Sequence, residues 1–405
     1  MSIWRYLLGR LVTGVLGLLV FASAVWVMST WLVPGDFVSN FAQSLDARQE
    51  AALRAQLGLD RPLFEQWVRF MGGLLRLDLG NGYSGFSPSG GADVPQVTGI
   101  PVTEMVLSVL PWTVSLFALS IAIGLLVGLP LGRRIGWSDR SVSPTLLVAA
   151  MATAIFPPWL ALIIANVGFN VIGAETYDRL RNLDEVLWDT PPSPVNVLWW
   201  MVAGVIVFGI GMVISARLTR LGRIPWLRWI APPLLIGAVV AVWLYTGLLP
   251  RVIDLLGYIA LPVGALALTA AGEVILVVAA AMAGTARAPY AGVAKAKGLS
   301  PGRVRNRHAG RATLLPAVSR LAASLPVALG GLVIVEFAFS SLGARSIHLE
   351  GLSSVIFFQG FQQRNTPLAV GAVIAIGFVA LIVRLALDVI HVALDPRIGY
   401  EAPDA

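Results

Sequence analysis

Long runs without a charged residue constrain this chain more than any other feature. The first extends from Leu11 to Pro34, and several more follow. The hydrocarbon core of a bilayer is about 30 Å thick, so a helix needs about 20 apolar residues to cross it. The composition agrees, since 57% of the 405 residues are hydrophobic and 13% are charged. A polytopic membrane protein is therefore expected, which excludes a soluble enzyme, a disordered regulator and a disulfide-stapled secreted domain.

The runs predict eight transmembrane helices in an all-α fold. Ala22-Ser23-Ala24 resembles a signal-peptidase site, but the apolar stretch continues past it, so an uncleaved first span is expected. The predicted spans are about Leu11–Pro34, Met105–Gly132, Val142–Ile172, Val197–Ala216, Ile230–Leu249, Tyr258–Gly284, Pro316–Phe337 and Pro367–Val389.

The distribution of Arg and Lys predicts that both termini are cytoplasmic. Cytoplasmic segments are enriched in these residues. With the N-terminus inside, the basic run Arg287–Arg320 lies inside, and the acid-rich segments 36–104 and 174–196 lie outside. The net charge of +7 is then explained by membrane orientation, so nucleic acid is not an expected partner. Membrane lipid is.

The outer loop 35–104 is patterned although it does not cross the membrane. Asp46 is placed to cap a first short helix, Gly58 to close it and Pro62 to begin a second. Residues 80–100 are rich in Gly, Ser and Pro and predict a loop. The second helix carries apolar residues on one face, which predicts a helix lying on the membrane surface. Its polar face fits a docking platform for an extracytoplasmic partner and consists of Arg61, Glu65 and Arg69.

The inner loop 285–316 is basic and carries helix-capping signals. Pro289–Lys297 predicts a short helix that Gly298 closes in the left-handed conformation, and Ser300 is placed to cap a second helix. A solvated loop that binds anionic lipid is one interpretation. The capping signals favour a rigid element instead.

The chain carries no sign of its own catalytic or metal chemistry. Gly298–Gly302 matches G-x-S-x-G, but that motif needs a strand-to-helix elbow with His and acid partners. Cysteine is absent and His308, His348 and His391 are far apart, so neither a metal site nor a resident cofactor is expected. A phosphate-binding P-loop is also missing. If ATP drives this protein, another subunit binds it.

At the basic loop the sequence resembles a known family, the membrane subunits of bacterial peptide ABC importers (dipeptide, oligopeptide and nickel permeases). The loop text AKAKGLSPGRVRNRHAGRATLLP is similar to the cytoplasmic loop of that family. Further segments resemble the family and follow one another in the same order along the chain. With the loop segment, the matching segments are Leu57–Gly80, Pro101–Leu116, Ala294–Pro316, Gly330–Gly343 and Ala393–Tyr400.

The resemblance implies a type I importer fold with six core helices, in the bacterial cell membrane. It implies as partners a second homologous permease, two ATPases that hold ATP and Mg, and an extracytoplasmic solute-binding protein. Loop 285–316 would couple to an ATPase. The residues implied in coupling are Tyr290, Ala294, Lys295, Ala296, Lys297, Gly298, Leu299, Ser300, Arg303, His308 and Pro316.

Three departures from the family pattern stand out. The acidic residue usual before the loop's Tyr290 is missing, and the stretch Val274–Ala286 lacks the Arg often found there. Eight spans instead of six imply an inserted transmembrane hairpin at 197–249. An even insertion preserves the topology, and the hairpin would either pack peripherally or bind an extra subunit.

Ionisable residues and prolines within the spans are candidates for the pathway or its gates. Glu273 lies mid-span, where a charge is costly. Glu336 is expected near the outer interface, close to an outer gate. Pro157 and Pro158 remove two backbone donors and predict a kink. Arg384 and Asp388 are expected to pair along one helix face.

The cargo that the resemblance implies is a di- or oligopeptide, with nickel chelates and oligosaccharides as alternatives in the same family. An ion-coupled secondary transporter is a competing class. It predicts midplane coupling residues and internal repeats, and Glu273 alone supports it. A membrane-embedded enzyme would need clustered acids, bases or metal ligands.

Overall fold

A computed structural model describes residues 3–87, 96–138, 144–155, 157–172, 183–220, 226–342 and 351–394. The first elements are α1 (Ile3–Leu32), the 3-10 helix η1 (Val38–Phe41), α2 (Ala47–Leu57), α3 (Leu63–Leu74), β1 (Asn81–Ser87), β2 (Gln96–Pro101), α4 (Val102–Trp137), α5 (Pro144–Ala154), α6 (Pro157–Ile172) and α8 (Glu185–Trp188). The rest are α9 (Pro194–Arg220), α10 (Leu227–Tyr245), α11 (Leu249–Ala286), α12 (Pro289–Ala296), α13 (Pro301–Arg303), the π-helix η2 (Val304–Ala309), α14 (Gly310–Ala312), α15 (Leu314–Leu342), α16 (Leu352–Ser354), the π-helix η3 (Val355–Gln362) and α17 (Thr366–Leu394).

The all-α membrane fold is confirmed. Within the described ranges, six helices are long and apolar enough to cross a membrane: α1, α4, α9, α11, α15 and α17. The pair α5 and α6 would make a seventh span if counted as one, although it bends by 109° at its break. The apolar part of α10, Ile230–Tyr245, is shorter. The count of eight spans stays a prediction.

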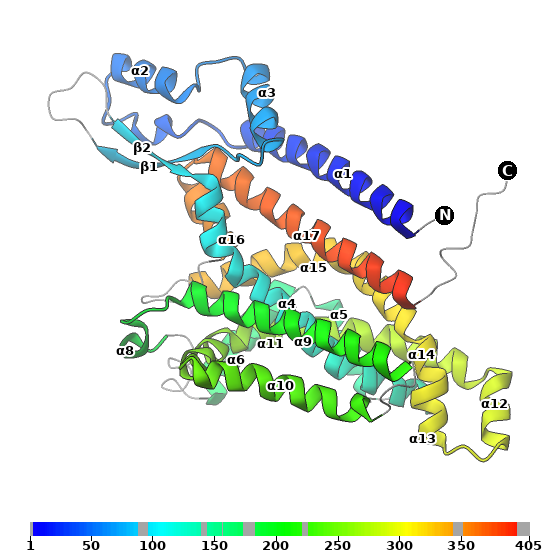
Figure 1. Ribbon diagram of the computed structural model, residues 1–405. Coiled ribbons are helices and arrows are strands. Elements are labelled where there is room, and N and C mark those ends of the chain that lie inside the picture. Colours follow the sequence, from blue (N-terminus) through cyan, green and yellow to red (C-terminus); the bar gives the residue numbers. More distant parts are fainter. Residues whose placement is uncertain are drawn as a thin grey trace, which may run out of the picture.

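The bundle has two distinct ends (Figure 1). The strands β1 and β2 lie with α2 and α3 at one end, called here the strand end. The helices α12 and α13 lie at the other, called the basic end, where α1 begins and α17 finishes. An ion pair between Arg10 Nε and Asp388 Oδ2, 3.6 Å apart, joins these two helices there. Asp388 therefore pairs across helices and not with Arg384 as the sequence predicted.

Close packing of α4 against α11 forms the centre of the bundle. On one face of α4 every fourth residue is a glycine, so the backbones of α4 and α11 can lie close together. Cβ atoms at these glycines would lie 2.7 to 2.8 Å from side-chain atoms of α11. The facing residues are Gly124 with Ala270, Gly128 with Val274 and Gly132 with Val278.

The predicted hairpin is joined to the main core at its base. Val197 and Leu198 of α9 are fully buried, in one cluster with Trp112 and Leu116 of α4. Further along, α9 and α10 pack on one another, with Gly211 against Leu235. The hairpin is therefore not peripheral over its whole length.

The outer loop forms a small folded layer at the strand end. Asp46 caps α2 through a capping box with Gln49, Gly58 closes α2 at φ +70°, and α3 begins after Pro62, as predicted. The prediction of a loop over residues 80–100 is wrong in part, because 81–87 and 96–101 pair as antiparallel strands. Residues 88–95 are outside the described part.

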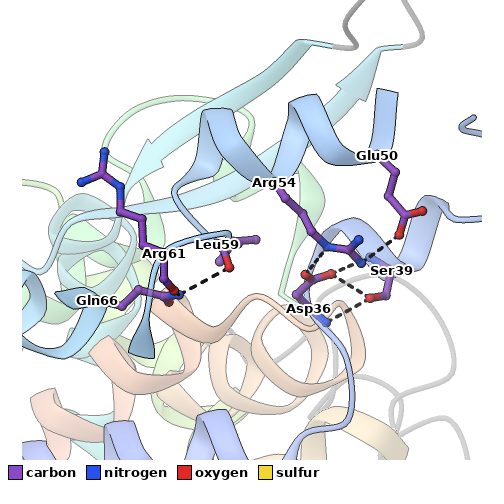
Figure 2. Close-up of polar contacts among 7 residues, drawn as sticks. All are labelled: Asp36, Ser39, Glu50, Arg54, Leu59, Arg61 and Gln66. Carbon is purple, nitrogen blue, oxygen red and sulfur yellow. Dashed lines mark hydrogen bonds and ion pairs between the residues drawn. The ribbon is translucent and has the colours of Figure 1, made fainter. Parts of the chain in front are cut away.

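A carboxylate fastens this layer to the end of α1 (Figure 2). Arg54 Nε donates to Asp36 Oδ2 at 2.8 Å, and Arg54 also pairs with Glu50 at 2.8 Å. The Ser39 N–H and O–H donate to Asp36 Oδ1 at 2.9 and 2.7 Å. Burial acts to raise the pKa of Asp36, but the hydrogen bonds from Arg54 and Ser39 outweigh it and hold the pKa below its usual value.

We predict that Gly128→Ala destabilises the bundle while Gly264→Ala does not. The new Cβ at 128 would sit 2.7 Å from Val274, so α4 and α11 must separate, at about 1–3 kcal/mol. A Cβ at 264 meets nothing within 4 Å. The stability of each variant is measured as the temperature at which it aggregates in detergent. Equal temperatures for the two variants would contradict the packing argument.

We predict that Asp36→Asn loosens α2 at pH 7 by about 1 kcal/mol, typical of a partly exposed hydrogen-bonded ion pair. The pKa of Asp36 is lower in the folded state, so its stabilisation is present above the ordinary value of 3.8 and is lost as the pH falls through the folded value. Hydrogen exchange of α2 amides, corrected for intrinsic rates, should differ from the native protein at pH 7 and converge in acid. Asp60→Asn, on an exposed residue, is the control.

Candidate functional site

The basic end carries the two short helices that the sequence predicted, α12 and α13. Gly298 follows α12 with φ +79°, the left-handed region. Ser300 occupies the N-cap position of α13 in extended conformation, with Pro301 first in the helix, although its side chain accepts no capping hydrogen bond. The second helix then continues through η2, a π-helix that the sequence did not reveal.

One face of α12 is anchored on its own chain. Ala291 and Ala294 of α12 and Val304 of η2 are buried together, and Trp137 at the end of α4 and Leu299 pack against them. These contacts hold α12 on η2, which in turn packs on the end of α4. Ala294 and Leu299, two of the residues implied in coupling, therefore contact the chain's own helices.

The opposite face of α12 is open. The Tyr290 side chain is 46% exposed and the Val293 side chain 55%. Of the other residues implied in coupling, the exposed ones are Ala296, Lys297, Gly298, Ser300 and Arg303, and Pro316 is half-buried in α15. The side chains of Lys295 and His308 lie outside the described residues.

A polar contact adds a second attachment between α4 and the basic end. Arg133 Nε donates to Thr313 Oγ1 at 3.2 Å, and Thr313 in turn donates to the Gly310 carbonyl at 2.8 Å. The Arg133 side chain lies over Gly310, where a Cβ would meet Nε at 3.3 Å. No local signal in the sequence names this distant partner of Arg133.

At the strand end, α3 lies on α1 through its apolar face. Trp67 Nε1 donates to Ser23 Oγ at 2.9 Å, and Phe70 stacks on Trp26 with ring centroids 6.2 Å apart. The opposite, exposed face carries Arg61, Glu65 and Arg69. The Arg61 carbonyl accepts from Gln66 Nε2 at 2.8 Å while its guanidinium points away from Gln66 (Figure 2).

Beside this face a cleft of about 730 Å³ opens between α1, α3, β1 and the start of α17. Its charged lining residues are Asp36, Arg69, Arg76, Asp78 and Arg364. Tyr83 also lines it, and burial, with the nearby charge of Asp36, raises the pKa of Tyr83 to about 12, so its hydroxyl stays protonated at neutral pH.

The residues that the sequence suggested for the pathway or its gates lie at three separate places in the structure. Pro157 opens α6 directly after the 109° bend and packs against Gly331 of α15, while Pro158 is buried. Glu273 Oε1 of α11 lies 3.7 Å from Arg320 Nη2 of α15. The sequence had named no partner for Glu273, because the two residues are on different helices.

Glu336 is enclosed within the bundle, and its place near the outer membrane interface stays a prediction. Its side chain is fully buried. Thr113 Oγ1 of α4 donates to Glu336 Oε1 at 2.8 Å, and the Ser353 N–H donates to Oε2 at 3.1 Å. The cover is supplied by Gly351, α16 and η3, which fold back toward α4.

Comparisons with known proteins place the chain in a family. A model of binding-protein-dependent transport system inner membrane components matches residues 221–400, and the model of the N-terminal part of such components matches residues 3–117. A putative peptide permease of Brucella ovis is 25% identical over 97% of this chain and 98% of its own length. A probable D,D-dipeptide transport system permease of Escherichia coli K12 is 26% identical over 95% of each chain. A dipeptide transport system permease of the same strain is 22% identical over 91% of each. The chain therefore belongs to the binding-protein-dependent inner membrane components, as a permease subunit of the peptide-type ABC importers in the bacterial inner membrane.

Proposed function

We propose that this subunit forms half of the translocation pathway of an ATP-driven importer of di- or oligopeptides. The carrying observation is the anchored α12, which offers one open face at the basic end while the strand end holds a folded layer. Relatives named as peptide and dipeptide permeases cover nearly the whole chain, which supports the cargo class. Importers of nickel chelates or oligosaccharides remain the alternative within the family.

In this proposal the chain crosses the membrane eight times, with the basic end in the cytoplasm. The bent pair α5 and α6 and the shorter α10 then complete the six long helices. The start of α1 and the end of α17, which lie at the basic end (Figure 1), would then both be on the cytoplasmic side. Of the proposed insertion at 197–249, residues 197–220 of α9 lie in the stretch 118–220 that neither family model matches, whereas residues 221–249 with α10 lie within a match.

Coupling to an ATPase would use the open face of α12. Tyr290, Val293 and Lys297 are exposed and fit a groove on a partner. The buried face of α12 packs on η2 in a cluster that Trp137 of α4 also contacts, and Arg133 ties α4 to Thr313. A displacement of α12 would therefore move α4 as a rigid body. ATP and Mg would be bound by the two ATPases and not by this chain.

At the strand end, a solute-binding protein would dock on the exposed face of α3, with Arg61, Glu65 and Arg69 as contacts. A second, homologous permease would complete the pathway. Glu273, Glu336, Pro157 and Pro158 would act in the pathway or at its gates, Pro157 by bending the third span.

Affinity purification of the chain from native membranes in mild detergent tests the assembly. We expect two ATPases, a second permease and a solute-binding protein, identified by mass spectrometry. Peptides eluted from that binding protein would define the cargo. Purification as a lone chain or homo-oligomer under several gentle conditions would overturn the importer assembly.

The left-handed residue after α12 allows a matched test of coupling. Gly298→Val places a β-branched side chain at φ +79°, which costs about 1–2 kcal/mol, whereas Asn tolerates this conformation. We predict that Gly298→Val lowers transport about tenfold in the reconstituted assembly while ATP hydrolysis continues, and that Gly298→Asn stays near the native rate. Full transport by the Val variant would remove Gly298 from the coupling element.

A further inference from the structure

The segment Gly351–Asn365, called here the re-entrant segment, begins deep in the bundle and finishes at the strand end. Its first helical residue, Leu352, donates its N–H to Thr113 Oγ1 at 3.0 Å. Thr113 lies about three turns into α4 from Val102, or about 16 Å. Its last residue, Asn365, contacts Tyr83 of β1. The segment therefore runs from inside the bundle out to the strand layer.

A buried hydrogen-bonded cluster, called here the clasp, fixes the deep end. The Leu352 N–H donates to Thr113 Oγ1, which donates to Glu336 Oε1, while the Ser353 N–H donates to Glu336 Oε2. The first N–H groups of a helix have no partner within it, and leaving them bare in an apolar interior is costly. The clasp supplies these partners from two other helices, α4 and α15.

Gly351 makes the clasp possible. A Cβ at this position would lie 1.9 Å from Glu336 Oε1 and 2.5 Å from Oε2. The carboxylate of Glu336 occupies the space that a side chain at position 351 would need. The clasp therefore depends on a particular residue from each of three separate elements.

A second set of hydrogen bonds joins the other end to the strand layer. Asn365 Nδ2 donates to the Tyr83 carbonyl at 2.6 Å, and the Tyr83 N–H donates to Asn365 Oδ1 at 3.2 Å. Asn40 Nδ2 donates to the Gln363 carbonyl at 2.7 Å. A movement of the strand layer would therefore pull on Asn365.

Between its two polar ends the segment presents an aromatic face. Phe337, which follows Glu336 on α15, lies 4.5 Å from Phe357 and 5.6 Å from Phe358 between ring centroids, and Phe357 lies 6.2 Å from Phe361. Phe361 is 44% exposed. This part is a π-helix, a geometry common at functional sites and wider than an α-helix. Aromatic side chains on such a segment suit a closure that excludes water.

We infer that the re-entrant segment is a gate at the strand end, which the clasp holds closed and which the Asn365 contact links to the strand layer. Docking of a solute-binding protein on that layer would act through Asn365 on the segment and release the clasp. This linkage rests on the proposed function, whereas the clasp itself does not. Glu336 and Thr113 are in this sense positioning residues, since they act through the segment.

The chain has no cysteine, so a single introduced thiol reports on the segment. Val355 is fully buried against α4 and α17, and Val355→Cys should react with a maleimide only when the segment lifts. Gln362→Cys, at an exposed position, reports insertion and labelling capacity in every variant. The experiment uses the complete assembly in membrane vesicles.

The clasp is tested by a pair of substitutions at one position. Thr113→Val keeps the shape and removes the hydroxyl, and Thr113→Ser keeps the hydroxyl. We expect labelling at 355 to rise about tenfold with Thr113→Val and to stay low with Thr113→Ser. Glu336→Gln, which offers one acceptor instead of two, should also raise it. Equal labelling in all four proteins, with normal labelling at 362, would overturn the clasp.

The linkage is tested by adding the loaded binding protein. Labelling at 355 should then rise in the native background and fail to rise with Asn365→Leu, which removes both bonds to Tyr83 without adding charge. A rise of the same size in the Leu variant would overturn the linkage. If native labelling does not rise although the binding protein co-purifies, the gate fails while the importer stands. If no binding protein is found, the proposed function fails, and the result for Thr113 still decides the clasp.

Discussion

The close approach of α4 and α11 along the glycine face is the contact on which the two ends of the molecule depend. A helix of 36 residues is about 54 Å long, so α4 reaches from one end of the bundle to the other. It carries Thr113 toward the strand end and Arg133 and Trp137 at the basic end. Because α11 supports this helix along much of its length, both sites are placed by a single packed element.

Much of the helical framework was predictable because its signals are local. Apolar runs gave the long helices, and caps such as Asp46, Gly58 and Gly298 gave the short ones to within a residue or two. The strands β1 and β2 were not predicted, since a Gly- and Ser-rich sequence indicates a loop unless the pairing strand is known. The burial of Val197 in one cluster with Trp112 could not be predicted, because it leaves no trace in local periodicity.

The polar contacts inside the spans were the least predictable part of the site. Glu273 stood out as a costly mid-span charge and Glu336 as a gate candidate, but their partners Arg320 and Thr113 are distant in sequence. The same holds for Asp388, whose partner Arg10 is at the other end of the chain. In an apolar interior such groups must find partners wherever the fold supplies them, so only the three-dimensional arrangement names them.

The contact between Gly351 and Glu336 has a consequence for how such a sequence can change over time. The volume that a side chain at 351 would need is already filled by the carboxylate. A lineage that gains a methyl group at 351 must shorten the acid at 336 in the same period, for example to Asp, or lose the helix cap. The two positions should therefore change together, although they are 15 positions apart in the chain.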